Sequence, residues 1–154
     1  MPNLRFRPAT REDIATILAL SIGGNAPGRE IVDDADAADT PEYQTAWDQI
    51  EDDPNNNYFI AELNGEAVGC VQLNILHGIA GRGKSRLQVE GVHIRADQRG
   101  QGLGGQMMRW VIEYGREKGA RLVQLTSSKT RPDAHRFYDN LGFERSHEGF
   151  KLAL

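Results

Sequence analysis

Hydrophobic and polar positions recur along this chain with two periods, and turn residues divide it into ten segments. A period of two is typical of strands that bury one face, and apolar residues every three or four positions are typical of helices. The expected strands are residues 4–9, 57–63, 66–76, 86–94 and 120–128, with one or two more within 144–154. The expected helices are residues 10–22, 40–53, 102–118 and a short one within 131–143. The order β-α-α-β-β-β-α-β-α-β predicts an α/β fold around a mixed sheet.

Local signals indicate where several of these elements begin or turn. Thr10 is a candidate N-cap, and Asp13 follows three residues later as a weak capping-box partner. Pro41 stands at the first position of the second helix, where its missing N–H is not needed. Asn64 and Gly65 are the pair favoured in type I′ turns, so the strands on either side of them are expected to form an antiparallel hairpin.

Four glycines fall within six residues, at positions 100, 102, 104 and 105, where the long helix should begin. Glycine is a poor helix former, so this concentration needs another reason. The first turn of a helix leaves backbone N–H groups without partners and carries partial positive charge, and glycine lets an anion come close to those amides. A strand, a glycine loop and a helix start therefore predict a phosphate-binding site.

Two familiar phosphate-binding motifs fit this loop poorly. A P-loop ends in Gly-Lys-Ser/Thr, whereas this loop ends in GGQ. Gly100, Gly102 and Gly105 formally match the dinucleotide pattern G-x-G-x-x-G. That pattern should be followed by an acidic residue after the next strand, but this strand ends in LTSSK and fewer than 50 residues remain beyond the loop. Both motifs are therefore disfavoured.

Composition restricts the class of protein. The chain has 154 residues, of which 39% are hydrophobic and 26% charged, so residues 1–154 are expected to form one globular domain. No apolar run is long enough to span a bilayer, and the start of the chain does not resemble a signal peptide, so a membrane partner is not expected. The single cysteine, Cys70, argues against an internal disulfide and against a zinc site, and no metal is expected. We therefore expect a cytoplasmic protein.

The net charge of −4 conceals an uneven distribution. Residues 1–81 hold 4 basic and 14 acidic side chains, whereas residues 82–136 hold 12 basic and 5 acidic ones. This pattern has two interpretations. The charges belong to an ordinary solvated surface, or they indicate two ligands, an anion bound at the basic segment and a cation near the acidic one. A nucleic-acid partner is not expected, because the basic segment lacks interleaved aromatic residues and the isoelectric point is about 5.6.

A third phosphate motif, R/Q-x-x-G-x-G/A, fits Arg99, Gly102 and Gly104. This motif resembles the pyrophosphate-binding signature of the GNAT N-acetyltransferase superfamily, whose members use acetyl-CoA. Residues 134–143, AHRFYDNLGF, resemble the family's A-x-x-F-Y-x-x-x-G-F segment, and the opening LRFRPATREDIATILAL resembles its first strand and helix. The C-terminal part is also similar to the aminoalkylphosphonate N-acetyltransferase branch and to uncharacterised bacterial relatives.

The resemblance implies a single-domain GNAT fold, with helices on both faces of a mixed central sheet whose strands 4 and 5 splay apart at a bulge. It also implies positions for acetyl-CoA. The pantetheine arm would contact the strand 4 backbone at Val92, His93 and Ile94. The pyrophosphate would meet the helix-start amides of Gln101, Gly102, Leu103, Gly104 and Gly105, and the turn before them would be shaped by Arg99 and Gly100. Arg131 stands where many members carry an Asn that contacts the cofactor, and an arginine there can meet phosphate instead. Arg136 and Lys129 are the candidates for the 3′-phosphate.

Acyl transfer from a thioester to an amine needs a neutral amine, a polarised carbonyl and a proton for the leaving thiolate. In the resemblance, Tyr138 stands at the place of the general acid, and a backbone amide of strand 4 polarises the carbonyl. Glu90 stands where several members carry a carboxylate that deprotonates the amine through water. His93 competes with it, because the ordinary pKa of a histidine is about 6.5. Strand alternation puts Glu90 and His93 on opposite faces, but a bulge would reset it, so the choice stays open.

The expected activity is therefore transfer of an acetyl group from acetyl-CoA to a primary amine of a small molecule. The alternatives are an acyl-CoA sensor with the same fold but no turnover, and an acetyltransferase that acts on a protein or on an aminophosphonate. Residues 22–53 favour a cationic acceptor, because their ten acidic side chains are accompanied by Arg29 alone. A homodimer is compatible with each of these interpretations.

Overall fold

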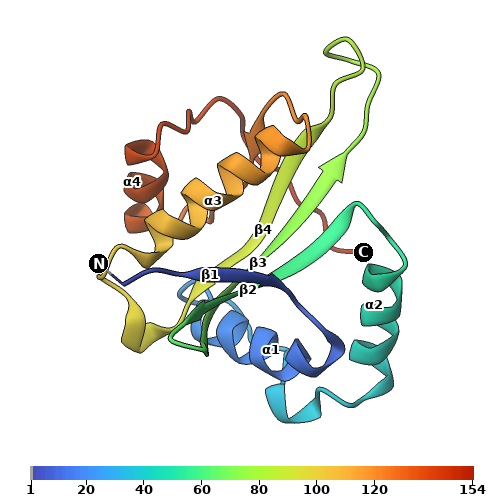
Figure 1. Cartoon of the computed structure of the whole chain (residues 1–154), viewed down its shortest axis with the longest axis vertical. Coiled ribbons are helices and arrows are strands. Elements are labelled where there is room, and N and C mark those ends of the chain that lie inside the picture. Colours follow the sequence, from blue (N-terminus) through green and yellow to red (C-terminus); the bar gives the residue numbers. More distant parts are fainter. Residues whose placement is uncertain (1) are drawn as a thin grey trace.

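The computed structural model describes residues 2–154, and within them five strands form one sheet in the order β1-β2-β3-β4-β5. The strands are β1 (Arg5–Pro8), β2 (Asn56–Leu63), β3 (Glu66–Leu76), β4 (Arg86–Ile94) and β5 (Val123–Gln124). The helices are α1 (Ile14–Gly23), α2 (Pro41–Glu51), α3 (Leu103–Glu117) and α4 (Pro132–Asn140), and 3₁₀ turns occupy Arg11–Asp13, Ala35–Ala37 and Ala96–Gln98. Figure 1 shows α3 lying along the sheet, with α4 beside its first turns.

Strands β1 to β4 pair antiparallel, and β5 runs parallel to β4 at the edge of the sheet. β4 and β5 pair at only two positions, Leu87 with Val123 and Gln88 with Gln124. β4 then continues to Ile94 without β5 beside it, so the two strands diverge after Gln88. The mixed sheet and its opening between strands 4 and 5 confirm the predicted architecture.

One face of the sheet carries the main hydrophobic core, which lies under α3. Apolar side chains spaced three and four residues apart on α3 pack against β2, β3 and β4. Among the least exposed members of this core are Ala61, Val71, Leu73, Leu87, Leu103, Met107, Met108 and Val111. Trp110 of α3 stacks on Phe6 of β1 with 4.5 Å between the ring centroids, so the first strand is tied to the same layer.

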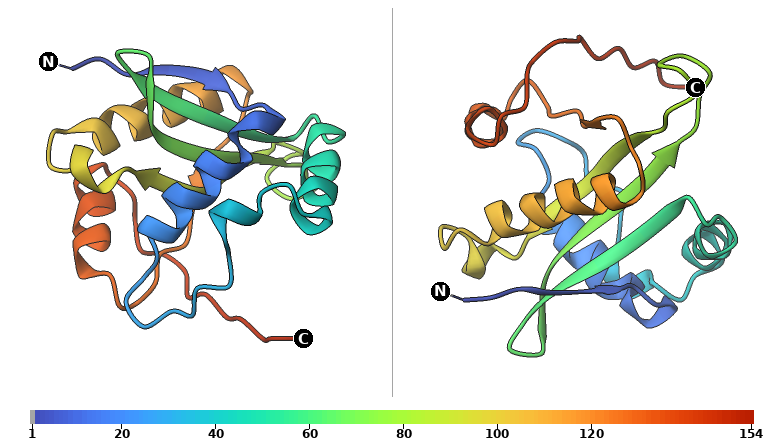
Figure 2. Two further views of the ribbon diagram at one scale, coloured as in Figure 1. Left: turned by 90° about the horizontal axis from the view of Figure 1, so that it is seen from below. Right: turned by 45° about the horizontal axis from the view of Figure 1, so that its top comes forward.

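The opposite face of the sheet is covered by α1, with α2 packed beside it (Figure 2). Leu20 of α1 packs against Ile60 of β2 and Cys70 of β3, and all three are buried. Trp47 of α2 packs against apolar side chains of α1 and against Tyr58 of β2. Helices therefore lie on both faces of the sheet, as predicted.

Polar side chains at the start of α1 form the capping arrangement predicted for Thr10 and Asp13. The Thr10 backbone N–H donates to Asp13 Oδ2 at 2.8 Å. Arg7 of β1 donates two further hydrogen bonds to the same carboxylate, at 2.7 and 2.9 Å, and a third to Glu62 of β2. The hydrogen bonds from Arg7 are the main reason why the pKa of Asp13 lies below its usual value. This ion pair joins β1 and β2 to the start of α1.

The turn between β2 and β3 has the geometry that its sequence predicts. Asn64 and Gly65 have φ angles of 53° and 82°. Left-handed backbone at both central residues is what a type I′ turn requires, and this turn matches the twist of the strands that it joins. The hairpin predicted from the Asn-Gly pair is therefore confirmed.

Two predictions about the C-terminal part of the chain are wrong. Residues 144–154 form no strand, and the strand expected over 120–128 is reduced to Val123–Gln124. Alternating residues form a strand only where a neighbouring strand accepts their backbone hydrogen bonds. Beyond Gln124, strand β4 has diverged, and residues 144–154 pair with none of the five strands.

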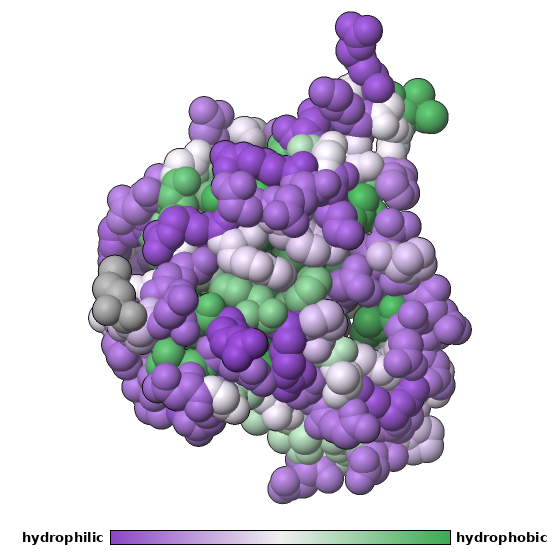
Figure 3. Space-filling model, viewed as in Figure 1, coloured by the Kyte–Doolittle hydropathy of each residue, from purple (hydrophilic) through white to green (hydrophobic). Residues whose placement is uncertain are grey.

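No helix in residues 2–154 combines the length and the apolar content that are needed to cross a bilayer. Most of the face seen in Figure 3 is hydrophilic, with an apolar area in its middle. The exposed large apolar side chains are Ile31 and Val32 in the loop after α1, Ile79 in the β3–β4 turn, and Phe150, Leu152 and Leu154 near the C-terminus.

Candidate active site

Strand β4 contains an irregularity at the point where the sheet opens. Gln72 of β3 lies opposite Glu90, and Cys70, two residues earlier, lies opposite His93, three residues later. β4 therefore carries one extra residue between Glu90 and His93, which defines a β-bulge. Gly91 within the bulge has a φ angle of 56°, a left-handed value that glycine adopts without steric cost.

The bulge determines which side chains share a face of the sheet. Directly opposite residues of an antiparallel pair point to the same side, so Glu90 and His93 both lie on the face that α1 covers. Val92 and Ile94 pack instead against the core under α3. Simple alternation would have separated Glu90 from His93, whereas the bulge keeps both on the face that α1 covers.

His93 is enclosed between β4 and the end of α1. A Cβ atom on Gly24 would lie 2.2 Å from His93 Nδ1, so the imidazole packs directly on that glycine. Burial, followed by the positive charges of Arg131 and Arg99, lowers the pKa of His93 to about 4. The imidazole is therefore neutral at neutral pH, and it lacks the near-neutral pKa that makes histidine an effective base.

The loop after β4 presents backbone amides at the start of α3. Gly100 and Gly102 have φ angles of 78° and 79°, and Gly102 is the N-cap residue. The first helical hydrogen bond runs from the Gln106 N–H to the Gly102 carbonyl at 3.1 Å. Helix geometry leaves the preceding N–H groups without a helical acceptor, and no acidic side chain lies in this turn. These groups belong to Leu103, Gly104 and Gly105, and they suit an anion.

Glycine is favoured for different local reasons at the positions of this loop. Gly100 and Gly102 need the left-handed backbone. A Cβ on Gly104 would lie 3.4 Å from the Phe137 ring, which is an ordinary van der Waals contact. A Cβ on Gly105 would meet only the movable end of the Arg109 side chain, at 3.2 Å. The fold itself therefore makes its weakest demands for glycine at Gly104 and Gly105.

Arg99 holds the loop in place through its side chain. Its Nε donates to the Ile94 carbonyl at 2.9 Å, and its Nη2 donates to the Gly23 carbonyl, at the end of α1, at 3.0 Å. The guanidinium thus ties the end of β4 to α1 and shapes the turn between β4 and α3. Gln101 is exposed, and its side-chain amide donates to Gln98 in the same turn.

Arg131, at the start of α4, acts electrostatically on Tyr138 of the same helix. The Tyr138 ring is half-buried and packs edge-on against Phe137 and Phe143. Burial raises the pKa of Tyr138 above its usual value, and the charge of Arg131 partly opposes that shift. The same arginine lowers the pKa of His93, so its guanidinium lies within electrostatic range of both rings. Arg131 forms no ion pair within residues 2–154.

Two glutamine side chains connect Glu90 to the point where β4 and β5 separate. Gln88, on the same face of β4, donates from Nε2 to Glu90 Oε1 at 3.0 Å. Gln124 of β5 donates to Gln88 Oε1 at 2.7 Å. The exposed carboxylate is therefore oriented by a chain of amides that begins at the last paired position of the two strands. Sequence patterns do not reveal these glutamines, because only the register of β4 and β5 brings residues 36 positions apart together.

Tyr58 of β2 is another residue that the sequence patterns miss. It lies opposite Gln72, which lies opposite Glu90, so the three side chains form one row across the sheet. Burial is the main cause that raises the pKa of Tyr58 to about 12, and nearby Cys70, Glu90 and Asp33 add to the shift. Tyr58 therefore lies within electrostatic range of both Glu90 and Asp33, which belongs to the acidic loop between α1 and α2 (residues 24–40).

A small apolar cavity of about 110 Å³ adjoins Tyr58 between α1, α2 and β2. It is lined by Ile14, Ile17, Leu18, Tyr43, Ala46, Trp47, Ile50 and Tyr58. The buried indole N–H of Trp47 has no hydrogen-bond partner within residues 2–154. The Tyr43 hydroxyl donates to Asp33 Oδ1 at 3.0 Å, which attaches the acidic loop to α2 beside this cavity.

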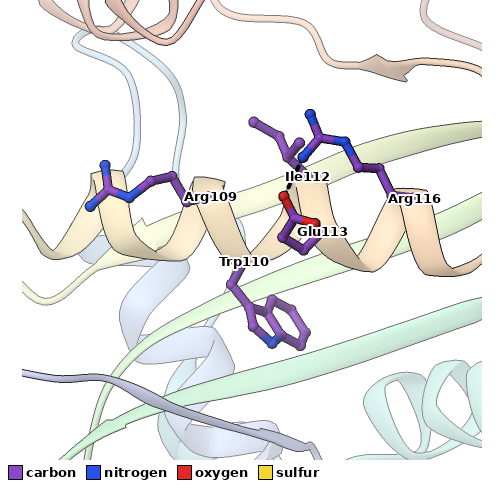
Figure 4. Close-up of a pocket in the computed structure, with 5 residues that line it drawn as sticks. All are labelled: Arg109, Trp110, Ile112, Glu113 and Arg116. Atoms are coloured by element: carbon purple, nitrogen blue, oxygen red, sulfur yellow. Dashed lines mark hydrogen bonds and ion pairs between the residues drawn. The ribbon is translucent and has the colours of Figure 1, made fainter.

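A larger hollow lies on the outer side of α3, away from these residues. Figure 4 shows that it is lined by Arg109, Trp110, Ile112, Glu113 and Arg116. All five side chains come from one helix, and Arg116 pairs with Glu113. None of the predicted site residues lines this hollow, so it is not part of the candidate active site.

Both cations considered for the 3′-phosphate have acidic neighbours. Arg136 pairs with Asp133 one turn earlier on α4, and Lys129 lies 3.9 Å from Glu148. All four side chains are exposed. Exposed pairs of this kind contribute little to stability, so either cation is free to exchange its partner for a phosphate.

Comparison with known proteins identifies the class of protein that this fold and site define. The model of the acetyltransferase (GNAT) family matches residues 28–143, so the chain belongs to the GNAT acetyltransferase family and is an acyltransferase. A curated relative, the aminoalkylphosphonate N-acetyltransferase of Salmonella typhimurium, is 33% identical over 159 residues, which cover 100% of this chain and 94% of the relative.

Solved structures have the same fold. A protein described as a transcriptional regulator from Bacillus halodurans C-125 matches with a TM-score of 0.89 and 35% identity, over 99% of this chain and 100% of that one. An aminoglycoside N-acetyltransferase solved in complex with CoA matches with a TM-score of 0.74 over 100% of this chain and 96% of that one. At 19% identity, the second likeness concerns the fold alone. The predicted GNAT fold is confirmed.

Proposed function

We propose that this chain transfers an acetyl group from acetyl-CoA to a primary amine of a small molecule. The observation that carries the proposal is the arrangement at the end of β4. A bulged strand diverges from β5 and leads into a helix start that has free N–H groups and no acidic side chain. Membership of the GNAT acetyltransferase family supports acetyl transfer as the reaction.

The residues at this junction suit acetyl-CoA. Beyond Gln88, β4 has no neighbour on the side of β5, so its backbone near Val92, His93 and Ile94 is open for the pantetheine arm. The pyrophosphate would meet the amides of residues 101–105, where the helix start favours negative charge. Arg131, which has no ion pair within residues 2–154, would add positive charge near His93 and Tyr138.

Acetyl-CoA supplies the thioester whose acetyl group is transferred. Tyr138 holds a proton on its hydroxyl throughout the neutral range, because burial raises its pKa, and this proton is available to the departing sulfur. Arg131 favours the ionised tyrosine that remains, since its charge lowers the pKa of Tyr138. A backbone N–H of β4 polarises the carbonyl.

Glu90 is the base in this proposal. Its carboxylate is exposed and oriented by Gln88, so it can take a proton from the ammonium group through a water molecule. His93 is the weaker candidate, because its ring packs against Gly24. Its pKa of about 4 also gives it no advantage in basicity over an ordinary carboxylate. In this proposal His93 contributes to the cofactor site through its backbone.

A cationic amine is the acceptor that the charge distribution favours. Asp33 and Glu90 both act on Tyr58, so two negative charges lie near one row of the sheet. Most of the other acids within residues 22–53 are exposed, and two of them pair with Arg11. Asp33 is therefore the member of the acidic loop that is best placed to attract a protonated amine.

An aminoalkylphosphonate is the second candidate acceptor. The relative that matches this whole chain carries that name. Arg86 precedes Gln88 and Glu90 on the same face of β4. It forms no ion pair within residues 2–154, so its guanidinium is available for a phosphonate.

A free-thiol release assay with acetyl-CoA tests the reaction and the acceptor. Release with any of a panel of diamines, amino acids, aminoalkylphosphonates and peptides would establish turnover. No release with any of them, together with thermal stabilisation by acetyl-CoA, would favour the acyl-CoA sensor. A diamine that reacts faster than an aminoalkylphosphonate, and that slows in Asp33→Asn and in high salt, supports the cationic acceptor.

The matched control is Asp36→Asn, which neutralises an exposed acid of the same loop and should leave the diamine rate unchanged. The opposite result would be a faster aminoalkylphosphonate whose rate falls in Arg86→Gln. That result would replace the cationic amine by the phosphonate as the acceptor, and it would leave the acetyltransferase assignment intact.

A further inference from the structure

The apolar cavity between α1, α2 and β2 has the size and the lining of a site for a compact apolar group. Its volume is about 110 Å³. An apolar cavity of about 150 Å³ stays dry and binds benzene, so a phenyl ring or a short branched alkyl chain is close to the largest group that fits here. The lining residues are all aliphatic or aromatic. Ala46 of α2 is one of them and is also exposed, so the cavity reaches the surface of the molecule.

Aromatic side chains make up part of the cavity wall. Tyr43 and Trp47 of α2 and Tyr58 of β2 line it. Aromatic rings bury a large area, and their faces attract positive charge, so this wall suits a ligand that is apolar and carries a cation. The Tyr58 hydroxyl has no hydrogen-bond partner within residues 2–154, and it is therefore available to such a ligand.

Negative charge is held at the rim of the cavity. The Tyr43 hydroxyl donates to Asp33 Oδ1 at 3.0 Å and accepts a hydrogen bond from the Asp34 N–H at 3.2 Å. The Asp33 carboxylate is therefore attached to a residue of the cavity wall. Asp33 and Glu90 both act electrostatically on Tyr58, and no basic side chain within residues 2–154 lines the cavity. These charges complement a ligand whose ammonium group stays outside the apolar space.

The row formed by Tyr58, Gln72 and Glu90 connects the cavity to the candidate base. All three side chains lie on the face of the sheet that α1 covers. Adjacent strands lie about 4.8 Å apart, so the backbones of Tyr58 and Glu90, two strands apart, are separated by roughly 10 Å. A molecule that places an apolar group in the cavity and an amine near Glu90 must therefore hold the two groups several bonds apart.

We propose that this cavity binds the apolar end of the acceptor, which is a primary amine joined through a short flexible chain to a phenyl ring or a branched alkyl group. In this arrangement the ammonium group lies near Asp33, and Glu90 reaches it through a water molecule. The cavity then determines which cationic amine is preferred. This inference rests on the proposed function, because it names the acceptor class for the same site.

Calorimetry with two amines, in the absence of acetyl-CoA, tests the cavity without relying on turnover. Phenylbutylamine should bind with a Kd roughly 10-fold or more below that of butylamine, because only the first amine has a ring to bury. Ala46→Leu narrows the cavity from the side of α2 and should abolish most of this difference. Thr45→Leu is the matched control, since it adds an apolar side chain at an exposed neighbour that does not line the cavity. It should keep the difference.

Two further variants test the filling of the cavity and the charge at its rim. Ile50→Phe fills the cavity from another position of α2, which covers the case in which the new side chain at position 46 turns toward solvent. Asp33→Asn should weaken the binding of phenylbutylamine and leave that of the neutral phenylbutanol unchanged. Equal Kd values for the two amines in the wild type, or a difference that survives in both Ala46→Leu and Ile50→Phe, overturns the proposal.

Thiol release from acetyl-CoA with the same two amines separates this inference from the reaction itself. Phenylbutylamine should have the lower KM and a similar kcat, because the ring binds away from the reacting atoms and contributes equally before and during the transfer. Thiol release with both amines, without any advantage for phenylbutylamine in KM, would overturn the inference and leave acetyl transfer intact. The expected calorimetric difference, together with no thiol release from any amine, would support the cavity as an amine site and refute the proposed reaction.

Discussion

Tyr138, His93 and Arg131 form a small group in which one positive charge acts on two rings. Burial is the larger influence on both rings, and it favours the neutral form of each. The charge of Arg131 further disfavours protonation of His93, whereas it favours ionisation of Tyr138. The group therefore combines a neutral imidazole with a phenol that keeps its proton until a strong base approaches. In this group Tyr138 is suited to protonating a thiolate, whereas His93 is poorly suited to act as a base.

Replacing Tyr138 by Phe keeps the ring that packs on Phe137 and Phe143 but removes the proton. We expect kcat to fall roughly 10²- to 10⁴-fold, the usual contribution of general acid catalysis, with the Kd for acetyl-CoA little changed. Steady-state kinetics and calorimetry provide the two measurements. Tyr114→Phe on α3 is the control, since that ring is also partly buried but packs on Phe59. An unchanged kcat, with chemistry shown to limit the rate, would leave Tyr138 as a packing residue.

Gln88→Leu should weaken catalysis without removing a catalytic residue, because it deletes the donor that orients Glu90. A hydrogen bond to a charged group is worth about 1.5–3 kcal/mol. We expect kcat to fall roughly 10-fold, which corresponds to about 1.4 kcal/mol, with the melting temperature nearly unchanged. Asn57→Leu is the control, since Asn57 of β2 donates to the Pro54 carbonyl and lies on the other face of the sheet from Glu90. Equal losses in the two variants would contradict a specific role for Gln88.

At the scale of elements, the arrangement proposed to hold the cofactor could be predicted from the sequence because its parts are contiguous. The end of β4, the glycine loop and the start of α3 follow one another along residues 86–106, so motif and geometry coincide. The residues proposed to face the acceptor are brought together instead by the pairing register of β2, β3 and β4. The row of Tyr58, Gln72 and Glu90 exists only because three strands align across a bulge, and the position of a bulge is not encoded in alternation.

Gly105→Asp tests the anion site at the start of α3. Substitution of Gly100 or Gly102 would strain a left-handed backbone and confuse folding with binding, whereas Gly105 faces only the movable end of Arg109. A carboxylate in the first turn favours the helix but repels a pyrophosphate. We therefore expect the melting temperature without ligand to be maintained and the thermal shift caused by acetyl-CoA to be lost.

The control for this experiment is Gly105→Asn, which has the same size without the charge, so it should retain more of the thermal shift than Gly105→Asp. If Gly105→Asp shows the wild-type shift with acetyl-CoA, the pyrophosphate does not lie at the start of α3.

At the scale of the whole molecule, the structure is a sheet with α3 on one face and α1 on the other, and the sheet opens between β4 and β5. The sequence predicted the layers, because each helix and strand carries its own periodic apolar face. It did not predict that β5 would shrink to two residues or that residues 144–154 would stay unpaired. Strand length is decided by neighbours distant in the chain, and within residues 2–154 no strand lies beside these residues.

Stability should decrease between pH 7 and pH 5 because of His93. The unfolded histidine takes up a proton near its ordinary pKa of about 6.5, whereas the folded one resists until its pKa of about 4. Since the unfolded state binds the proton first, lowering the pH through this window favours unfolding, by about 1 to 2 kcal/mol at pH 5. The pKa of Asp13 is also lowered, mainly by its hydrogen bonds with Arg7. The contribution of Asp13 to the free energy of unfolding is fully present above the unfolded pKa of about 3.9, so it changes little between pH 7 and pH 5.

Urea unfolding at pH 7 and pH 5, at one protein concentration and without ligand, measures this difference in the free energy of unfolding. In His93→Gln the difference should shrink by about 1 to 2 kcal/mol, because the group that binds the proton on unfolding is gone. His77→Gln, which changes an exposed histidine in the β3–β4 turn, should keep the wild-type difference. If His93→Gln retains the full dependence, the imidazole is not held neutral between β4 and α1. The preference for Glu90 as the base would then lose one of its two supports, and the packing of His93 on Gly24 would remain as the other.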